Sequence, residues 1–229
     1  MYKYPDVDDK NLIKNVMTSD WEDSSNLEEK YINESIQLLP PNLRNLLLDA
    51  GCGQEGRLFP YFKNNFKIII AIDPDIARLS KAKETNRNDK NIKYFLSTIE
   101  NFSYEDKFDF IICSHVIHHM CTYNVKGILQ NLYNLMQPHG LLALLTTNWP
   151  ENEDQFEIRN TLTNHVEIVD EESFNQCVIK NDHHLPTRHF SEKTLRQLIN
   201  DVNFKIIFLK KYHGYPKIRG DNFILLKKQ

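Results

Sequence analysis

The stretch Leu46-Leu-Leu-Asp-Ala-Gly-Cys-Gly-Gln-Glu-Gly56 decides the fold of this 229-residue chain, because an apolar strand runs directly into closely spaced glycines. Gly51 and Gly53 allow a tight turn and let the backbone approach a ligand without a Cβ in the way. The next segment, residues 57–65, predicts a helix whose first N–H groups are free to bind a polar group. The pattern therefore predicts a strand, a glycine-rich turn and a helix that together bind a compact polar ligand.

Short apolar runs of strand length alternate with longer amphipathic segments beyond this turn. The alternation predicts helices over 77–86 and 124–140, the second ended by Pro138 and Gly140. Near-continuous Leu, Ile and Val content is typical of parallel strands that helices cover on both faces. We therefore predict an α/β, doubly wound, Rossmann-like fold. Its predicted strands are Leu46–Asp49, Ile68–Asp73, Ile92–Leu96, Phe108–Cys113 and Leu141–Thr146.

The flanking segments have a different texture. Residues 1–40 predict a helical arm, with a short amphipathic helix within 1–25 and a second helix over 26–38. Residues 41–229 are predicted to form the main domain, in which the polar stretch 148–190 is an insertion or lid with one or two helices. After it, a helix capped by Ser191 and two strand-like runs predict a closing hairpin.

Composition restricts the class of protein. Hydrophobic residues make up 41% and charged residues 26% of the chain, which indicates a folded globular domain. The 28 basic and 31 acidic residues give a net charge of −3, so there is no overall positive field for nucleic acid. No apolar run approaches the length of a membrane helix, the beginning of the sequence lacks the apolar core of a signal peptide, and the four cysteines form no CxxC pair. We expect a cytoplasmic protein with reduced thiols and no membrane contact.

Glycine and acid spacing together predict the kind of ligand. Gly51, Gly53 and Gly56 satisfy G-x-G-x-x-G, and Asp73 lies 73 − 51 = 22 residues beyond the first glycine, at the end of the next predicted strand. An acid at that place can accept hydrogen bonds from ribose hydroxyls. An adenosine-type cofactor is implied.

At these residues the sequence resembles the class I S-adenosylmethionine-dependent methyltransferases, over about residues 43–147. The first motif of that family, an acid followed by x-G-x-G, stands here as Asp49-Ala-Gly51-Cys-Gly53, and the other matching motifs are Ile70–Asp75, Phe95–Phe102, Phe108–Met120 and Pro138–Thr147. The resemblance implies a mixed seven-stranded sheet with a C-terminal antiparallel hairpin. It also implies S-adenosylmethionine as cofactor, at the carboxyl ends of the first two strands.

The resemblance assigns roles to individual residues. Asp49 and the Gly51 backbone would lie near the amino-acid end of the cofactor, Asp73 would bind both ribose hydroxyls, Thr98 and Ile99 would flank adenine, and Ser114 would line the methionine side. The full predicted cofactor site is Asp49, Gly51, Cys52, Gly53, Asp73, Pro74, Thr98, Ile99 and Ser114. The sequence departs from many relatives in two places: Glu55 stands where the third glycine is common, and Ser97-Thr98 stands where an acid is common.

Histidines supply the candidate catalytic residues. His115, His118 and His119 follow the fourth predicted strand, where a neutral imidazole could remove a proton from an acceptor, although structural roles weigh more for each. His183, His184 and His189 gather near Asp182, but a His-His pair in a polar loop is more often solvated than metal-bound, so we predict no metal site. Eight acidic residues between 151 and 172 either attract a cationic acceptor or form a solvated face, and the second interpretation is favoured.

The predicted activity is methyl transfer from S-adenosylmethionine to a nitrogen or oxygen of a small molecule. No Asn-Pro-Pro-Tyr-like run follows the fourth strand, which favours small acceptors over nucleic acid, although protein and RNA acceptors stay open as alternatives. An NAD(P)-dependent oxidoreductase that uses the same glycine-rich turn is the second hypothesis. A cofactor-binding protein without turnover is the third.

Overall fold

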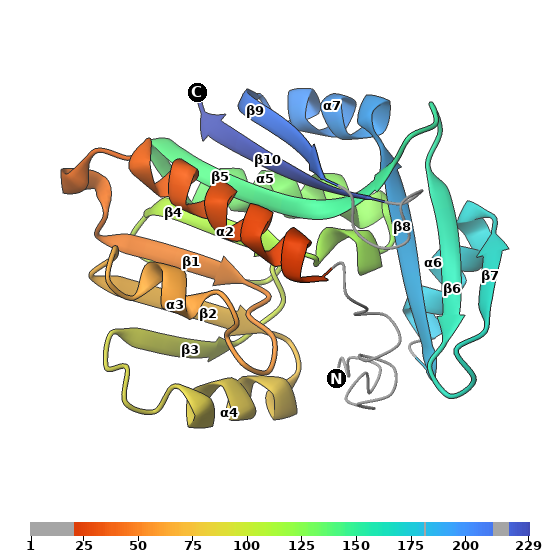
Figure 1. The fold of residues 1–229 in the computed structure, drawn as a ribbon, viewed down its shortest axis with the longest axis horizontal. Helices are drawn as coiled ribbons and strands as arrows, with labels where there is room; N and C mark the ends of the chain where they lie inside the picture. The colour runs from red at the N-terminus through yellow and green to blue at the C-terminus, as the bar shows by residue number, and fades with distance from the viewer. Residues whose placement is uncertain (1–20, 181, 213–219) are drawn as a thin grey trace.

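The computed structural model describes residues 21–180, 182–212 and 220–229, and its centre is a mixed sheet with the strand order β3-β2-β1-β4-β5-β10-β9. Strands β3 to β5 along this order run parallel, whereas β10 is antiparallel to both β5 and β9. This confirms the predicted Rossmann-like central sheet with its C-terminal antiparallel pair (Figure 1). The complete sheet has ten strands instead of the predicted seven, because three strands of the insertion continue it from the end of β5. The strands are β1 Leu46–Ala50, β2 Ile68–Asp73, β3 Ile92–Leu96, β4 Phe108–Ser114, β5 Met136–Trp149, β9 Phe204–Tyr212 and β10 Gly220–Lys228.

Helices cover both faces of this sheet because its central strands are apolar on both sides. Leu47 and Ile69 face a core with α2 (Trp21–Gln37), α3 (Phe59–Phe62) and α4 (Ile76–Thr85). Leu48 and Ile70 face the other core, with α5 (Val125–Leu135) and α7 (Glu192–Asp201). Successive residues of a strand point to opposite faces, so continuous burial of β1 requires these two layers.

Several element bounds differ from the predictions. The helix after the glycine-rich turn is a single turn, α3, rather than 57–65. Helix α5 ends at Leu135, and β5 begins at Met136, so Pro138 and Gly140 lie within a strand instead of ending a helix. The predicted cap of α7 is confirmed, because Ser191 Oγ accepts a hydrogen bond from the backbone N–H of Thr194.

The insertion 148–190 contains one helix, within the predicted one or two, and three strands that the sequence did not predict. It consists of β6 (Gln155–Asn160), β7 (Val166–Val169), α6 (Glu171–Lys180) and β8 (His184–Ser191). Strand β6 pairs antiparallel with β7 and β8, and the end of β8 pairs parallel with the end of β5. The insertion is therefore a small sheet joined to the end of β5, beside the main sheet (Figure 1).

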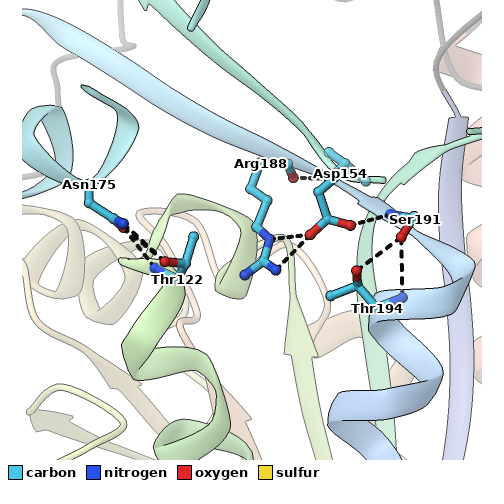
Figure 2. A network of polar contacts seen from close by, with 7 residues as sticks. Thr122, Asp154, Asn175, Arg188, Ser191 and Thr194 are labelled. Carbon is cyan, nitrogen blue, oxygen red and sulfur yellow. Dashed lines mark hydrogen bonds and ion pairs between the residues drawn. The ribbon is translucent and has the colours of Figure 1, made fainter. Parts of the chain in front are cut away.

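Buried polar contacts fasten this small sheet. Arg188 on β8 donates from Nε to Asp154 Oδ2 at 2.6 Å, its Nη2 also lies 2.6 Å from that oxygen, and the N–H of Ser191 donates to Asp154 Oδ1 at 2.8 Å (Figure 2). A second contact joins α6 to the segment before α5: the N–H of Thr122 donates to Asn175 Oδ1 at 2.8 Å. The side chains of Arg188 and Asp154 are only 9% and 6% exposed, so this is a buried ion pair.

The arm predicted at residues 1–40 is described only from Trp21 onward, and its short first helix lies outside the described residues. The described helix α2 packs on the sheet through Ile32 and Ile36. Within the described part of the chain, no helix combines the length and apolar character needed to cross a bilayer.

Candidate cofactor and acceptor site

The glycine-rich turn follows β1 and depends on glycine geometry. The backbone N–H groups of Gly51 and Cys52 donate to the carbonyl of Ile72 in β2, at 2.9 and 3.0 Å. Gly51 has φ +92° and Gly53 φ +66°, a region that residues with a Cβ rarely adopt. A Cβ on Gly51 would also lie 2.4 Å from Val116 Cγ2. The turn is therefore held tightly against β2 and the segment after β4.

Asp73, at the end of β2, is held by the same turn. Its Oδ2 accepts from the N–H of Gly53 at 3.0 Å, and its Oδ1 accepts from the N–H of Asp75 at 2.9 Å. Burial raises the pKa of Asp73, although these two hydrogen bonds and the charge of Arg78 oppose the rise. Each carboxylate oxygen keeps a further lone pair, so Asp73 can accept from two neighbouring hydroxyl groups at once.

Asp49 is the second buried acid of the site. It is 2% exposed, and burial raises its pKa to about 7; the charge of Arg57 opposes this shift and that of Asp73 adds to it. A cationic group placed beside Asp49 would lower this pKa and keep the carboxylate ionised. The neighbouring Cys52 thiol has its pKa raised, mainly by burial, and is therefore no thiolate nucleophile.

Glu28 and Arg57 contact the predicted site residue Ser114, and neither was predicted from the sequence. Arg57 donates from Nη1 and Nη2 to the two carboxylate oxygens of Glu28, at 2.7 and 2.9 Å. Ser114, at the end of β4, lies 3.4 Å from Arg57 Nη2 and 3.5 Å from Glu28 Oε1. The ion pair thus joins α2, the glycine-rich turn and the predicted Ser114. In the sequence, Glu28 is one of the acids in the first turn of the helix predicted over 26–38. No sequence motif relates it to Arg57.

The predicted adenine-side residues follow β3, next to the end of β2. The N–H of Ser97 donates to the backbone carbonyl of Asp73 at 3.2 Å, which brings the two strand ends together. Ile99 is buried and its carbonyl accepts from Asn131 Nδ2 at 2.6 Å, while Thr98 is partly exposed. The structure therefore brings Thr98 and Ile99 to the same edge of the sheet as Asp73 and the glycine-rich turn. Pro74, partly exposed, directly follows Asp73.

The three predicted histidines form a chain of ring contacts after β4. His119 Nδ1 lies 2.7 Å from the carbonyl of Pro186 on β8, His119 Nε2 lies 3.0 Å from His118 Nε2, and His118 Nδ1 lies 3.3 Å from Thr146 Oγ1. His115, at φ +56°, packs edge-on against His118 with ring centroids 5.4 Å apart.

The backbone carbonyl of Pro186 determines which ring nitrogens of His119 and His118 carry protons. A carbonyl can only accept, so His119 donates from Nδ1, its Nε2 accepts from His118, and His118 Nδ1 accepts from the hydroxyl of Thr146. Burial lowers the pKa of His118 well below its usual value and that of His119 to about 4. Both rings are therefore neutral at pH 7, with all four nitrogens engaged.

The cluster of histidines around Asp182 is separated in the structure. His184 Nδ1 pairs with Asp182, whereas His189 Nε2 lies 3.3 Å from Glu157 Oε2. Among residues 21–180, 182–212 and 220–229, no three His, Cys, Asp or Glu side chains gather in a metal-binding arrangement. Two of the eight acids between 151 and 172, Asp154 and Glu157, are buried in contacts on β8 instead of forming a solvated face.

Comparisons with known proteins agree with this geometry. Residues 48–144 match the family model of a methyltransferase domain. A ubiquinone biosynthesis O-methyltransferase from Rickettsia typhi is 31% identical over 121 residues, which are 52% of this chain and 48% of that protein. One from Rhodopseudomonas palustris is 30% identical over 103 residues, or 44% of this chain and 40% of that protein. The chain thus spans about half the length of the curated relatives it matches.

Solved structures share the fold at low sequence identity. The 1,6-didemethyltoxoflavin-N1-methyltransferase of Burkholderia thailandensis, solved with bound 1,6-didemethyltoxoflavin and S-adenosylhomocysteine, has a TM-score of 0.64 and 15% identity. The match covers 92% of this chain and 84% of that one. TehB from Haemophilus influenzae has a TM-score of 0.62 and 16% identity, covering 87% of this chain and 62% of that one. Both likenesses bear on the fold alone.

Proposed function

We propose, from the premise that this chain belongs to the class I S-adenosylmethionine-dependent methyltransferase family, that it binds S-adenosylmethionine and methylates a hydroxyl oxygen of a small molecule. The observation that carries the proposal is Asp73, whose two oxygens are each held by one backbone N–H beside the turn of Gly51 and Gly53. The oxygen acceptor is supported by the relatives named O-methyltransferases.

The residues present fit this cofactor. Asp73 can accept hydrogen bonds from both ribose hydroxyls. Because Gly51 and Gly53 have no Cβ, the cofactor can approach the backbone of the turn closely. Asp49 is a buried acid with a pKa raised to about 7, which a cationic amino-acid end would stabilise as a carboxylate. The full proposed cofactor site is the predicted one with two additions: Asp49, Gly51, Cys52, Gly53, Asp73, Pro74, Thr98, Ile99 and Ser114, with Glu28 and Arg57 supporting Ser114.

The bound cofactor supplies a methyl group on a sulfonium, which is already an activated donor. The chain therefore contributes mainly alignment of the acceptor and exclusion of water. Ligands of open α/β sheets bind at the carboxyl ends of the strands, which places the acceptor above β4 and β5, next to the insertion. Of the three predicted histidines, we assign His118 and His119 to positioning, because their neutral rings join the segment after β4 to β8. His115 stays the candidate for lining the acceptor.

Two alternatives remain to be separated by experiment. A nicotinamide-dependent oxidoreductase would use the same turn and Asp73, but neither the family match nor the relatives favour it. A cofactor-binding protein without turnover would bind S-adenosylmethionine and methylate nothing.

Calorimetric titration with S-adenosylmethionine, S-adenosylhomocysteine, NAD and NADP tests the proposal. We expect binding of the first two only, and Asp73→Ala should weaken it by at least tenfold, because charge-assisted hydrogen bonds contribute about 1.5–3 kcal/mol each. Asp106→Ala, at an exposed acid away from the site, is the matched control. Binding of a nicotinamide cofactor alone, or unchanged affinity in Asp73→Ala, would contradict the assignment.

A further inference from the structure

A buried imidazole on β8 has a lone pair that the site described so far does not use. His189 is 6% exposed, its Nε2 lies 3.3 Å from Glu157 Oε2 on β6, and its Nδ1 is buried with no hydrogen-bond partner among the described residues. Glu157 is 4% exposed and has Arg159 Nη2 3.6 Å from its Oε1. A buried polar atom without a hydrogen-bond partner lowers the stability of the fold, so His189 Nδ1 is a candidate for binding a ligand.

The contact with Glu157 fixes which nitrogen carries the proton when the His189 ring holds a single one. A carboxylate can only accept hydrogen bonds, and Arg159 Nη2 lies on the other side of Glu157, 3.6 Å from its Oε1. Nε2 of His189 therefore donates to Glu157, and Nδ1 presents its lone pair. This is the arrangement in which an acid orients an imidazole to act as a base.

His189 lies at the sheet edge where the acceptor is proposed to bind. The end of β8 pairs with the end of β5, with Asn148 opposite Phe190, and the carboxyl ends of these strands face the side where the cofactor is proposed. His189 lies near enough to Asp221 on β10 and to His118 that a proton gained by its ring would lower the pKa of both groups. Its ring centroid is 6.3 Å from that of Trp149.

Three further buried oxygens without a hydrogen-bond partner in the described part of the chain lie near the same ends of β5, β6 and β10. Asn148 and Asn222 each have an Oδ1, and Gln155 an Oε1, for which the described residues supply no donor. Gln155 is the register partner of His189, and Asn222 donates to the carbonyl of Thr147. A small molecule with hydroxyl groups would donate to these oxygens, whereas an apolar one would leave them unsatisfied.

We propose that His189, oriented by Glu157, is the general base that activates the acceptor hydroxyl; this inference rests on the proposed function. The hydroxyl proton passes to His189 Nδ1 as the oxygen lone pair forms a bond to the methyl carbon. The carbon–sulfur bond breaks with its electron pair going to sulfur, which leaves a neutral thioether. The imidazolium formed is stabilised by the Glu157 carboxylate and returns its proton to water.

A purely structural His–Glu pair is the competing explanation, and the tautomer alone does not separate the two. The first measurement is nitrogen NMR of the histidine rings in the S-adenosylhomocysteine complex, with His189→Gln to assign the signals. We expect His189 to carry its proton on Nε2, and Glu157→Ala to abolish that preference while Glu157→Gln, whose amide oxygen can still accept, retains it. A proton on Nδ1 would overturn the proposal without any acceptor being known.

The second measurement is turnover against a panel of phenols, catechols, aliphatic alcohols and amines. General bases contribute about 100-fold to 10,000-fold, so His189→Gln should lower kcat by at least about 100-fold with KM for S-adenosylmethionine unchanged. His165→Gln, at an exposed histidine in the connection between β6 and β7, is the matched control. Full activity in His189→Gln, or loss in His115→Gln alone, would overturn this proposal.

Failure of the proposed function has a different signature. A wild-type chain that does not bind S-adenosylmethionine, or binds it and methylates no member of the panel, contradicts the methyltransferase proposal and removes the premise of this inference with it. Methylation of amines but no hydroxyl compounds, at the same rate in His189→Gln, would contradict the role of His189 and the oxygen acceptor together while leaving the cofactor assignment intact.

Discussion

Replacing Asp154 with alanine should destabilise the chain far more than loss of a surface ion pair. The carboxylate contacts two nitrogens of Arg188 at 2.6 Å and accepts from the N–H of Ser191 at 2.8 Å, and both charged side chains are less than 10% exposed. Its removal leaves the guanidinium buried beside the rings of Phe156 and Phe190 without its counter-charge. Breaking a buried pair from one side costs about 3–5 kcal/mol.

Urea unfolding followed by circular dichroism gives this free energy directly. The matched control is Lys126→Ala, which removes a salt bridge to Asp201 whose side chains are 57% and 39% exposed, and it should change the free energy of unfolding by less than about 1 kcal/mol. Hydrogen exchange should show the loss concentrated in β6 and β8, because Asp154 also holds the N–H at the end of β8.

A loss of less than about 1 kcal/mol in folded Asp154→Ala would contradict the proposed cost of an unpaired, buried Arg188. The double variant Asp154→Ala with Arg188→Met separates the two contributions. Since the unpaired charge is the main cost, the double variant should be more stable than Asp154→Ala alone. An additive further loss would show that packing of Arg188 on Phe190, not charge, holds β8 in place.

Two further predictions concern the cofactor turn. Gly51→Ala places a Cβ 2.4 Å from Val116 Cγ2 at φ +92°, so thermal denaturation should show a loss of at least about 1–2 kcal/mol, which Val116→Ala partly restores; no loss would contradict the strained turn. The pKa of Asp49 rises from 3.8 to about 7 on folding, so the folded chain holds a proton that the unfolded chain releases between these values. The free energy of unfolding without cofactor should therefore fall as pH rises from about 4 to about 7, relative to Asp49→Asn, in urea titrations; parallel curves would contradict it.

The central sheet could be predicted because its pattern is local. Strands Ile68–Asp73 and Ile92–Leu96 have the predicted bounds, since short apolar runs between polar helices determine buried parallel strands. Residues near strand ends, such as Asp49 and Asp73, could be placed for the same reason: the carboxyl ends of parallel strands meet at one edge.

The insertion could not be predicted, because its strands depend on partners far along the chain. Strand β7 reads Val-Glu-Ile-Val and is half exposed, and β8 contains Pro186, which favours an edge strand or no strand. Ladder pairing of β6 with β8, 24 to 34 residues apart, stabilises them instead. The Glu28–Arg57 ion pair was missed for the same reason, since it spans 29 residues and no motif.

The two faces of β8 carry side chains with different roles: Arg188 stabilises the strand, and His189 on the opposite face is the proposed base. Arg188 and Phe190 share one face, where the guanidinium stacks on the ring at 4.5 Å and pairs with Asp154. Successive strand residues point to opposite faces, so the His189 side chain lies on the other face, where it contacts Glu157. A one-residue slip of β8 would exchange the two faces. The Asp154–Arg188 pair therefore stabilises the register that orients His189. Asp154→Ala should lower turnover while leaving unchanged the affinity for S-adenosylmethionine, whose proposed site is at β1 and β2.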